Sequence, residues 1–513
     1  MNRQISRVAL VGLVLLAALV VATTYWQTWA STGLADRQDN EIQRVAQFEI
    51  KRGLIYASDG KTVLAANKRE KVAGQTIYTR TYPTHGFASQ AVGYSTQSRS
   101  RTGLERSEND YLTASNGNLG TLLSSLGDKL KGSTVTGNNL VLNLNVAAQQ
   151  TAQSLLDKAG CGAAVALDPR TGAVLAMASS PSYDPNLVEK TNGYAQIQKL
   201  KAHCSPAAPL LNRATQGLYP PGSTFKTITA AAAIDDHVYG PSSTFEDPGY
   251  CIDYGQKVTN ADDQNGPEVY GLVNLVEAYE HSINAVFCNI GQKLGSTRIL
   301  QEAKKFGFYS VPPLETPADA RSASGLYDKG KLYDPKNADQ AVDAGRLAFG
   351  QERMLVTPLQ MALVASAVAD KGIEMKPQLV KKVLSPGGGT VATMSPHTWK
   401  RATSAKTAAD LNQMMVAVVQ GGTGTEAQIP GVEVAGKTGT AETGTPHVYD
   451  AWFIFYAPAD HPVVAGAVIV ENQLNGFGGA IAAPIAKAIM QSILTPSDAQ
   501  KTSTTTAAGS AGN

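Results

Sequence analysis

Cysteine is scarce in this sequence: its 513 residues include 4, and no two of them form a C-x-x-C pair. The seven histidines likewise show no H-E-x-x-H or other metal-ligand spacing. Both absences argue against a zinc site. Four widely spaced cysteines still suit an oxidising compartment. They allow three complete pairings, of which we favour Cys161 with Cys204 and Cys251 with Cys288.

A charge imbalance is also missing. Lysine and arginine number 44 against 42 aspartates and glutamates, and the formal net charge is +2. No long run of like charge and no basic stretch interleaved with aromatic residues occurs, so a nucleic-acid partner is not expected. Hydrophobic residues make up 43% of the chain, which is enough for a sizeable core. The length suggests about three domains.

Acidic residues are absent before Asp36. Arg3 and Arg7 precede an apolar run over residues 8–22, and aromatic residues follow it at positions 25, 26 and 29. We expect residues 1–30 to be a short cytoplasmic stub with an uncleaved transmembrane signal anchor, and the rest of the chain to lie outside the cytoplasm. The alternative is a cleaved signal peptide, for which residues 30–35 offer small side chains; cleavage would release a soluble exported protein.

Beyond the anchor, the sequence suggests two folded units and a tail. Residues 31–150 are polar and turn-rich with short strand-like runs, and predict a smaller non-catalytic domain. A stretch rich in Gly, Ser and Thr at 114–138 predicts loops. Residues 151–495 predict the larger domain. Residues 496–513 are rich in Ser, Thr, Ala and Gly and predict a disordered tail.

The larger domain is predicted to be α+β. Helical patterns precede and follow three strand-like runs, and short links between those runs imply an antiparallel meander. The domain is therefore expected to hold an antiparallel sheet between helices. The predicted helices are 275–294, 357–370, 404–419 and 481–494, and the predicted meander strands are 432–442, 450–456 and 463–471.

The first catalytic candidate is the segment Tyr219-Pro-Pro-Gly-Ser-Thr-Phe-Lys226. Its prolines and glycine precede an alanine-rich helix, so Ser223 and Lys226, three residues apart, face the same way. A serine hydroxyl becomes a nucleophile when a base takes its proton. A lysine kept neutral by burial or by a neighbouring cation can be that base. The plainer interpretation is a capped helix, because one S-x-x-K match in a chain of this length is expected by chance.

Two further motifs follow along the chain. Ser282 and Asn284 form an S-x-N in which a hydroxyl and an amide could relay and orient protons, although helix capping would explain such a pair as well. The segment Lys437-Thr438-Gly439-Thr440 lies on the first predicted meander strand. Its cation and hydroxyls could bind a substrate carboxylate, and its glycine would admit a substrate backbone. The plainer interpretation is an edge strand protected by lysine.

The same strand contains a misleading match, because residues 431–438 fit the phosphate-loop pattern G-x-x-x-x-G-K-[ST]. A phosphate loop needs a flexible loop between its glycines and a helix that opens at the lysine. Here the intervening residues are Val-Glu-Val-Ala, and Thr-Gly-Thr follows the lysine pair. We therefore predict a strand and no nucleotide site.

The order S-x-x-K, S-x-N and K-T-G is the motif set of penicillin-binding proteins and serine β-lactamases, and the chain resembles that family over nearly its whole length. The N-terminal region resembles the pedestal of class B, monofunctional members, most of all the actinobacterial penicillin-binding protein A subfamily. The pedestal-like segments are Arg52-Gly-Leu-Ile55, Arg80-Thr-Tyr-Pro83 and Thr102-Gly-Leu-Glu105.

The resemblance implies a peptidoglycan D,D-transpeptidase that cross-links stem peptides ending in D-Ala-D-Ala and is inhibited by β-lactams. Ser223 would be the nucleophile and Lys226 its base, with Ser282 and Asn284 beside them. Residues 437–440 would bind the terminal carboxylate, and the reaction would need neither a metal nor a cofactor. A membrane glycan polymerase of the shape, elongation, division and sporulation type is implied as partner, in cell division or growth. Two alternatives stay open: a D,D-carboxypeptidase or β-lactamase-like hydrolase, and a non-enzymatic β-lactam sensor or divisome scaffold.

Overall fold

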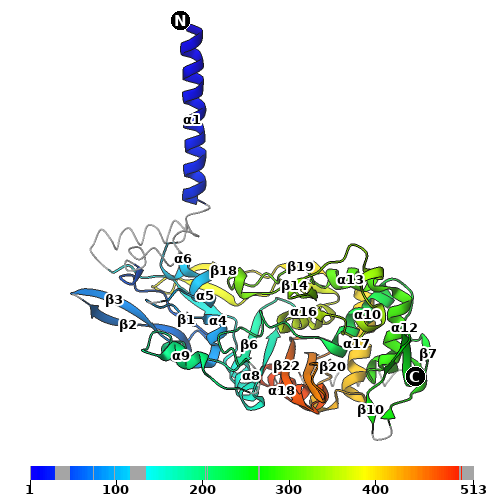
Figure 1. The fold of residues 1–513 in the computed structure, drawn as a ribbon. Coiled ribbons are helices and arrows are strands. Elements are labelled where there is room, and N and C mark those ends of the chain that lie inside the picture. The colour runs from blue at the N-terminus through cyan, green and yellow to red at the C-terminus, as the bar shows by residue number, and fades with distance from the viewer. Residues whose placement is uncertain are drawn as a thin grey trace, which may run out of the picture.

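The computed structural model describes residues 2–28, 47–72, 74–97, 99–115, 134–202, 204, 206–263, 266–495 and 498. Helix α1 (Asn2–Thr28) stands apart from an elongated body, and the smaller and larger predicted domains lie at different ends of that body (Figure 1). Most of the predicted loop 114–138 and almost all of the predicted tail lie outside the described residues.

Helix α1 agrees with the predicted apolar segment. Its stretch Arg7–Tyr25 has a mean hydropathy of 2.5, and none of it is buried against the rest of the protein. An apolar helix of this length, left uncovered, fits either a membrane anchor or a signal sequence.

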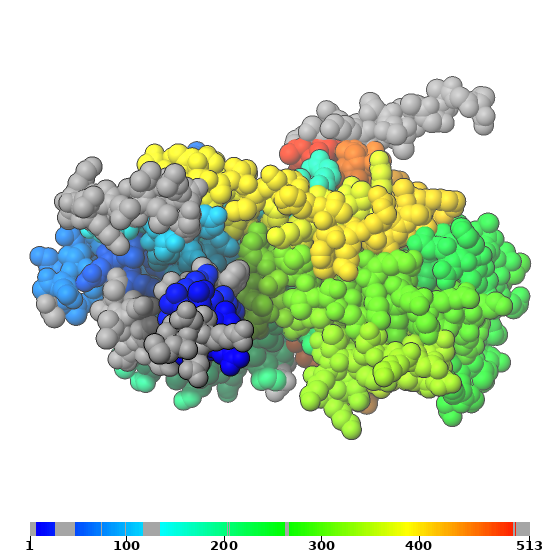
Figure 2. All heavy atoms as spheres, turned by 90° about the horizontal axis from the view of Figure 1, so that it is seen from above, coloured from blue at the N-terminus to red at the C-terminus, as the bar shows by residue number. Residues whose placement is uncertain are grey.

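The pedestal is organised around a six-stranded sheet in the order β18-β17-β4-β1-β2-β3. Four of its strands come from the N-terminal region, whereas β17 and β18 come from far along the chain, and Figure 2 shows atoms of that later region (yellow) against the pedestal (blue and cyan). One sheet thus contains strands from both sides of residue 150, and the predicted cut there stays a prediction. The strands are β1 (Ile55–Tyr56), β2 (Val63–Val72), β3 (Gln75–Thr81), β4 (Asn139–Leu142), β17 (Val380–Leu384) and β18 (Thr390–Thr393).

A buried ion cluster joins the three pedestal segments singled out in the sequence. Glu105 accepts from Arg52 at 2.9 Å and from Arg80 at 2.7 Å, and all three side chains are buried. Burial on its own raises the pKa of the Glu105 carboxyl, but the two arginines outweigh it and hold that pKa below its usual value. The cluster therefore links the strand region to helix α5 (Gly103–Ser107).

The larger domain contains the predicted antiparallel sheet between helices, in the order β20-β21-β22-β5-β6. Alternate residues of β21 point to opposite faces: Trp452 and Ile454 join one core cluster, and Phe453 and Phe455 join the other. Helices α8 and α18 cover one face, and α16 and α17 cover the other. These elements are β5 (Gly162–Leu167), β6 (Val174–Ser180), β20 (Ala435–Glu442), β21 (Val448–Ala457), β22 (Val464–Leu474), α8 (Val146–Ala159), α16 (Pro358–Ala369), α17 (Ala405–Gln420) and α18 (Gly478–Ile493).

Short elements complete the described part of the chain. In the pedestal region they are η1 (His85–Ala88), α4 (Ser89–Val92) and α6 (Asn109–Leu112). In the larger domain they include η2 (Pro185–Leu187), α9 (Gly193–Gln198), α13 (Ser296–Lys305), η4 (Ala318–Ala320), β13 (Gly325–Asp328), β14 (Lys331–Leu332), α14 (Ala338–Ala341), α15 (Ala344–Leu347), β15 (Met354–Leu355), β16 (Ile373–Met375), β19 (Thr398–Arg401) and η5 (Thr425–Ala427).

The helix predicted over 275–294 is wrong in one respect, because the chain forms two helices, α11 (Leu275–Glu280) and α12 (Asn284–Leu294). Ser282 between them has a φ of 60°, in the left-handed region. The Ile283 amide then donates to the Ala278 carbonyl at 2.9 Å, which closes α11 as a left-handed cap does.

The stretch before α11 forms a series of short strands. They are β7 (Thr244–Asp247), β8 (Tyr250–Asp253), β9 (Gln256–Thr259), β10 (Asp262–Asp263), β11 (Gly266–Pro267) and β12 (Gly271–Asn274). Strand β7 pairs with β12, and β8 pairs with β9. We call residues 244–274 the insertion.

Two disulfides have the pairing favoured from the sequence. Cys161 bonds to Cys204, and Cys251 bonds to Cys288. The first joins the start of the central sheet to the chain that precedes the Ser223 segment. The second joins the insertion to helix α12.

Glu374 on β16 is fully buried, and within the described residues neither of its carboxylate oxygens has a hydrogen-bond partner. Burial raises the pKa of this carboxyl well above its usual value, although Lys400 on the paired strand opposes the rise. The folded state therefore binds the proton more tightly than the unfolded chain, and its stability falls as pH rises above the unfolded pKa, near 4.5. At neutral pH the residue destabilises the fold.

We expect Glu374→Met to raise the free energy of unfolding at pH 7 by about 1–2 kcal/mol, because it removes an unsatisfied buried polar group. Thermal unfolding in detergent at pH 5 and pH 7 measures the effect, which should be larger at pH 7. Exposed Glu426 supplies the control Glu426→Met, which should change little. A less stable Glu374→Met protein at pH 7 would contradict this account of the carboxyl.

Candidate active site

Ser223 lies in the short helix η3 (Gly222–Phe225), and Lys226 begins α10 (Lys226–Asp235) directly after it. Ser223 is partly accessible, whereas Lys226 is fully buried. Gly222 has a φ of 51°, and a Cβ there would come within 2.8 Å of the Thr440 carbonyl oxygen. Glycine therefore lets the turn that carries Ser223 pack closely against strand β20.

The amine of Lys226 lies among groups of the S-x-N segment. Its Nζ donates to the Ser282 carbonyl at 2.6 Å and to Asn284 Oδ1 at 2.8 Å, and it lies 3.2 Å from Ser282 Oγ. The break between α11 and α12 makes this possible, because the left-handed Ser282 turns its carbonyl and side chain to the same amine. A continuous helix would have directed that carbonyl along its own axis.

Burial, and next the charge of Lys437, lower the pKa of Lys226 well below its usual value. A neutral amine has two N–H groups and one lone pair. The two short contacts, to the Ser282 carbonyl and Asn284 Oδ1, use both N–H groups. The lone pair is then free to accept a proton from a hydroxyl, as a general base must.

Lys437 on β20 is also fully buried. Its Nζ donates to the Thr438 carbonyl at 3.2 Å, and burial lowers its pKa to about 7. Of the two lysines, we assign the proton to Lys437. Lys226 is further depressed by its neighbour's charge, whereas burial alone lowers Lys437. An incoming carboxylate would strengthen that assignment.

The rest of the K-T-G segment lies beside the serine turn. A Cβ on Gly439 would meet the Pro221 carbonyl at 2.9 Å, so glycine keeps the two backbones close. Thr438 Oγ1 lies 2.6 Å from Thr423 Oγ1. Thr440 Oγ1 accepts from the Gly478 amide at 3.4 Å, at the start of α18. The structure therefore brings the predicted residues of all three motifs into one region.

This geometry also decides between strand and phosphate loop. Strand β20 runs from Ala435 through Glu442, and no helix opens at Lys437. The prediction of a strand at this position is confirmed.

Sequence reasoning missed a buried network behind the serine turn. Glu471 on β22 accepts from Arg213 Nε at 2.7 Å and from the Tyr219 hydroxyl at 2.9 Å. Trp452 Nε1 donates to the Pro220 carbonyl at 2.9 Å. These bonds fix residues 219–220, just before Ser223. No short motif joins residues 213 and 471, so only the three-dimensional structure identifies them as a pair.

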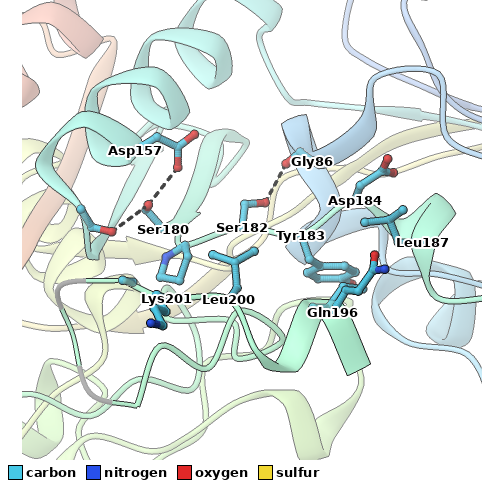
Figure 3. A pocket seen from close by; sticks show the side chains of 14 residues that line it. Gly86, Asp157, Ser180, Ser182, Tyr183, Asp184, Leu187, Gln196, Leu200 and Lys201 are labelled. Atoms are coloured by element: carbon cyan, nitrogen blue, oxygen red, sulfur yellow. Dashed lines mark hydrogen bonds between the residues drawn. The ribbon is translucent and has the colours of Figure 1, made fainter. Parts of the chain in front are cut away.

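A large cavity lies elsewhere, lined by residues within 157–202 and by Gly86 of the N-terminal region (Figure 3). Its volume is about 800 Å³, and none of the predicted site residues lines it. Figure 3 shows Asp157 and Ser180, 2.8 Å apart, on one side and Leu200 and Lys201 on the other. The candidate active site is therefore defined by the motif residues, and this cavity is not part of it.

Comparison with known families agrees with the motifs. The penicillin binding protein transpeptidase domain matches residues 162–491, and the penicillin binding protein A dimerisation domain matches residues 52–140. The chain belongs to the class B penicillin-binding protein transpeptidases. As a member of this family it is a peptidoglycan D,D-transpeptidase, and the fold and activity expected from the sequence are confirmed.

Similar proteins span almost the whole chain. It is 36% identical to the peptidoglycan D,D-transpeptidase PbpA of Mycolicibacterium smegmatis, over 96% of this chain and 99% of that protein. The PbpA of Mycobacterium tuberculosis is 34% identical with the same coverage. The ceftriaxone acyl-enzyme structure of penicillin-binding protein A from M. tuberculosis has a TM-score of 0.77 at 32% identity, covering 88% of this chain and all of that one.

Proposed function

We propose that the transpeptidase reaction of this chain proceeds through an acyl-enzyme on Ser223. Neutral Lys226 removes the serine proton, and Ser223 Oγ attacks the carbonyl of the penultimate D-alanine of a stem peptide. The terminal D-alanine leaves after protonation through Ser282. The amine of a second stem peptide then attacks the ester, which forms the cross-link and restores the serine. The observation that carries this proposal is the buried Lys226 amine, which Ser282 and Asn284 contact and whose pKa is lowered by burial and next by the charge of Lys437.

The K-T-G residues take the substrate in this proposal. Protonated Lys437, with Thr438 and Thr440, binds the terminal carboxylate, and Gly439 leaves room for the substrate backbone. Backbone amides of Ser223 and Thr440 serve as the oxyanion hole, where one donor commonly contributes about 3–4 kcal/mol to transition-state stabilisation. Asn284 orients Lys226 and the substrate amide. No step in this scheme uses a metal or a cofactor.

β-Lactams are proposed to acylate the same serine. The M. tuberculosis penicillin-binding protein A has been solved as ceftriaxone and imipenem acyl-enzymes. This chain is 32% identical to it and carries S-x-x-K, S-x-N and K-T-G in that order. A β-lactam acyl-enzyme of this chain is therefore expected to resist hydrolysis, as an inhibited transpeptidase does.

We further propose that α1 is an uncleaved single-pass anchor that places both folded units outside the cytoplasm. The two arginines before its apolar run and the two disulfides support this orientation. A non-catalytic pedestal over 31–150, a transpeptidase domain over 151–495 and a membrane glycan polymerase as partner complete the proposal. The resemblance to class B proteins supports the polymerase partner.

The products formed from natural muropeptides test the reaction. We expect the purified full-length chain to convert stem pentapeptides into cross-linked dimers and to release one D-alanine for each bond formed. Chromatography with mass spectrometry separates dimers from trimmed monomers. Monomers alone would indicate a carboxypeptidase, and neither product would favour a non-enzymatic role. Penicillin-treated enzyme is the control and should yield no dimers.

A further inference from the structure

The insertion, residues 244–274, is organised around a buried carboxylate. Asp247 is 1% exposed and accepts three hydrogen bonds: from the Gly249 amide at 3.0 Å, the Tyr270 amide at 3.0 Å and Asn260 Nδ2 at 2.9 Å. These donors come from both halves of the insertion. Asp247 therefore fixes where Asn260 lies.

Every polar group of the Asn260 side chain is used. Its Nδ2 donates to Asp247 and, at 2.9 Å, to the Glu268 carbonyl, so its Oδ1 must face the other way. That oxygen accepts from the Ala285 amide at 2.9 Å. Ala285 is in the first turn of α12, whose own N-cap residue, Ile283, provides no side-chain acceptor. Asn260 thus caps α12 from a distant part of the chain.

The neighbouring residue contacts the active site directly. The Thr259 carbonyl accepts from Asn284 Nδ2 at 3.2 Å, and Asn284 Oδ1 accepts from Lys226 at 2.8 Å. An amide whose nitrogen is held on one side must present its oxygen on the other. The Cys251–Cys288 disulfide fastens the insertion to α12 one turn beyond Asn284. Asp247 and Asn260 are therefore connected to the proposed base through Thr259 and Asn284.

We propose that Asn260 is a positioning residue of the transpeptidase, which sets the orientation of the Asn284 amide and thereby the place of the Lys226 amine. The inference rests on the proposed function, because it assigns Lys226 as the base. The side-chain hydrogen bonds of Asn260 go to Asp247, Glu268 and Ala285, so Asn260 is not itself one of the proposed catalytic groups. Its effect reaches the reaction through the start of α12 and the Thr259 carbonyl, so its loss displaces Asn284 without removing any catalytic group.

The test measures acylation of the full-length chain in detergent by a fluorescent penicillin, together with thermal unfolding. We expect Asn260→Ala to lower the second-order rate constant of acylation about tenfold or more in protein that is still folded, because displaced catalytic groups cost rate steeply. The milder Asp247→Asn should lower this rate constant about threefold, since the substitution weakens the hydrogen bond to Asn260 but keeps the Asn260 cap on α12. Ile252→Thr, at an exposed position of β8, is the control and should acylate at the wild-type rate.

A double-mutant cycle separates positioning from a general loss of structure. If Asn260 acts through Asn284, Asn260→Ala should slow an Asn284→Ala protein little further, and the two effects should not add. Additive effects of Asn260→Ala and Asn284→Ala would overturn the inference. Wild-type acylation rates in both Asp247→Asn and Asn260→Ala would overturn it as well. If Asn260→Ala does not fold, wild-type acylation by Asp247→Asn overturns it alone. Failure of the proposed function has a different signature: Ser223→Ala would still be labelled.

Discussion

Replacing Ser223 with alanine should abolish covalent labelling of the full-length chain by a fluorescent penicillin. The variant lacks the hydroxyl proposed to form the ester, and we expect neighbouring Thr224 not to replace it, because its hydroxyl is buried and donates to the Pro221 carbonyl at 2.7 Å. Cross-linking of muropeptides should fall with it, by about 10⁶-fold for complete loss of the nucleophile. Gel fluorescence measures the first effect and chromatography measures the second.

The control for this experiment is another serine. Ser154 lies on α8, far from η3 in sequence, and Ser154→Ala should keep full labelling. Mass spectrometry of digested wild-type protein should place the adduct on the peptide that contains Ser223. An adduct on any other peptide, or labelling that survives Ser223→Ala, would remove Ser223 from its assigned role.

Lys437→Ala should lower the acylation rate constant for benzylpenicillin about 100-fold, because it removes the buried cation that we propose binds the ligand carboxylate. The pH profile of the wild-type protein should reveal the same group. Acylation should rise from low pH as Lys226 loses its proton, and fall above a pH of about 7 as Lys437 loses its own. Stopped-flow or gel-based acylation between pH 5 and pH 9 measures both limbs.

A penicillin methyl ester serves as the matched ligand, since it lacks the carboxylate. Wild-type protein should react slowly with the methyl ester, and Lys437→Ala should lower the acylation rate constant for this ester little further. Equal sensitivity of the acid and the ester to the substitution would mean that Lys437 acts on Lys226 and not on the carboxylate. Unchanged kinetics with both ligands would remove Lys437 from the site.

Much of this site was open to sequence reasoning because its parts are local. Ser223 and Lys226 are one helical turn apart, and Lys437 to Thr440 are consecutive on one strand. The meander was predictable for a similar reason: short links between strand-like runs permit only antiparallel neighbours. Each of these inferences used only a few consecutive residues and the known residue spacing of a helix or a strand.

What the sequence did not reveal depends on long-range contacts. The break at Ser282 carries no glycine or proline signal, and the surrounding apolar pattern continues through it. Arg213 and Glu471 are 258 positions apart, and Thr259 reaches Asn284 only because the insertion folds back. The insertion contains strands of two and four residues, which are too short to show a recognisable alternation of apolar and polar residues in the sequence.

The pedestal sheet has a consequence for anyone who engineers this protein. Strands β17 and β18 lie in the second half of the chain, yet β17 hydrogen-bonds to β4 of the first half. A chimera that exchanges only residues 31–150 for those of a relative would pair the relative's β4 with β17 of this chain, and these two strands did not evolve together. A domain exchange that preserves the pairing of β4 with β17 must include residues 380–393. The unit that can be exchanged in this enzyme therefore consists of two segments that are far apart in the sequence.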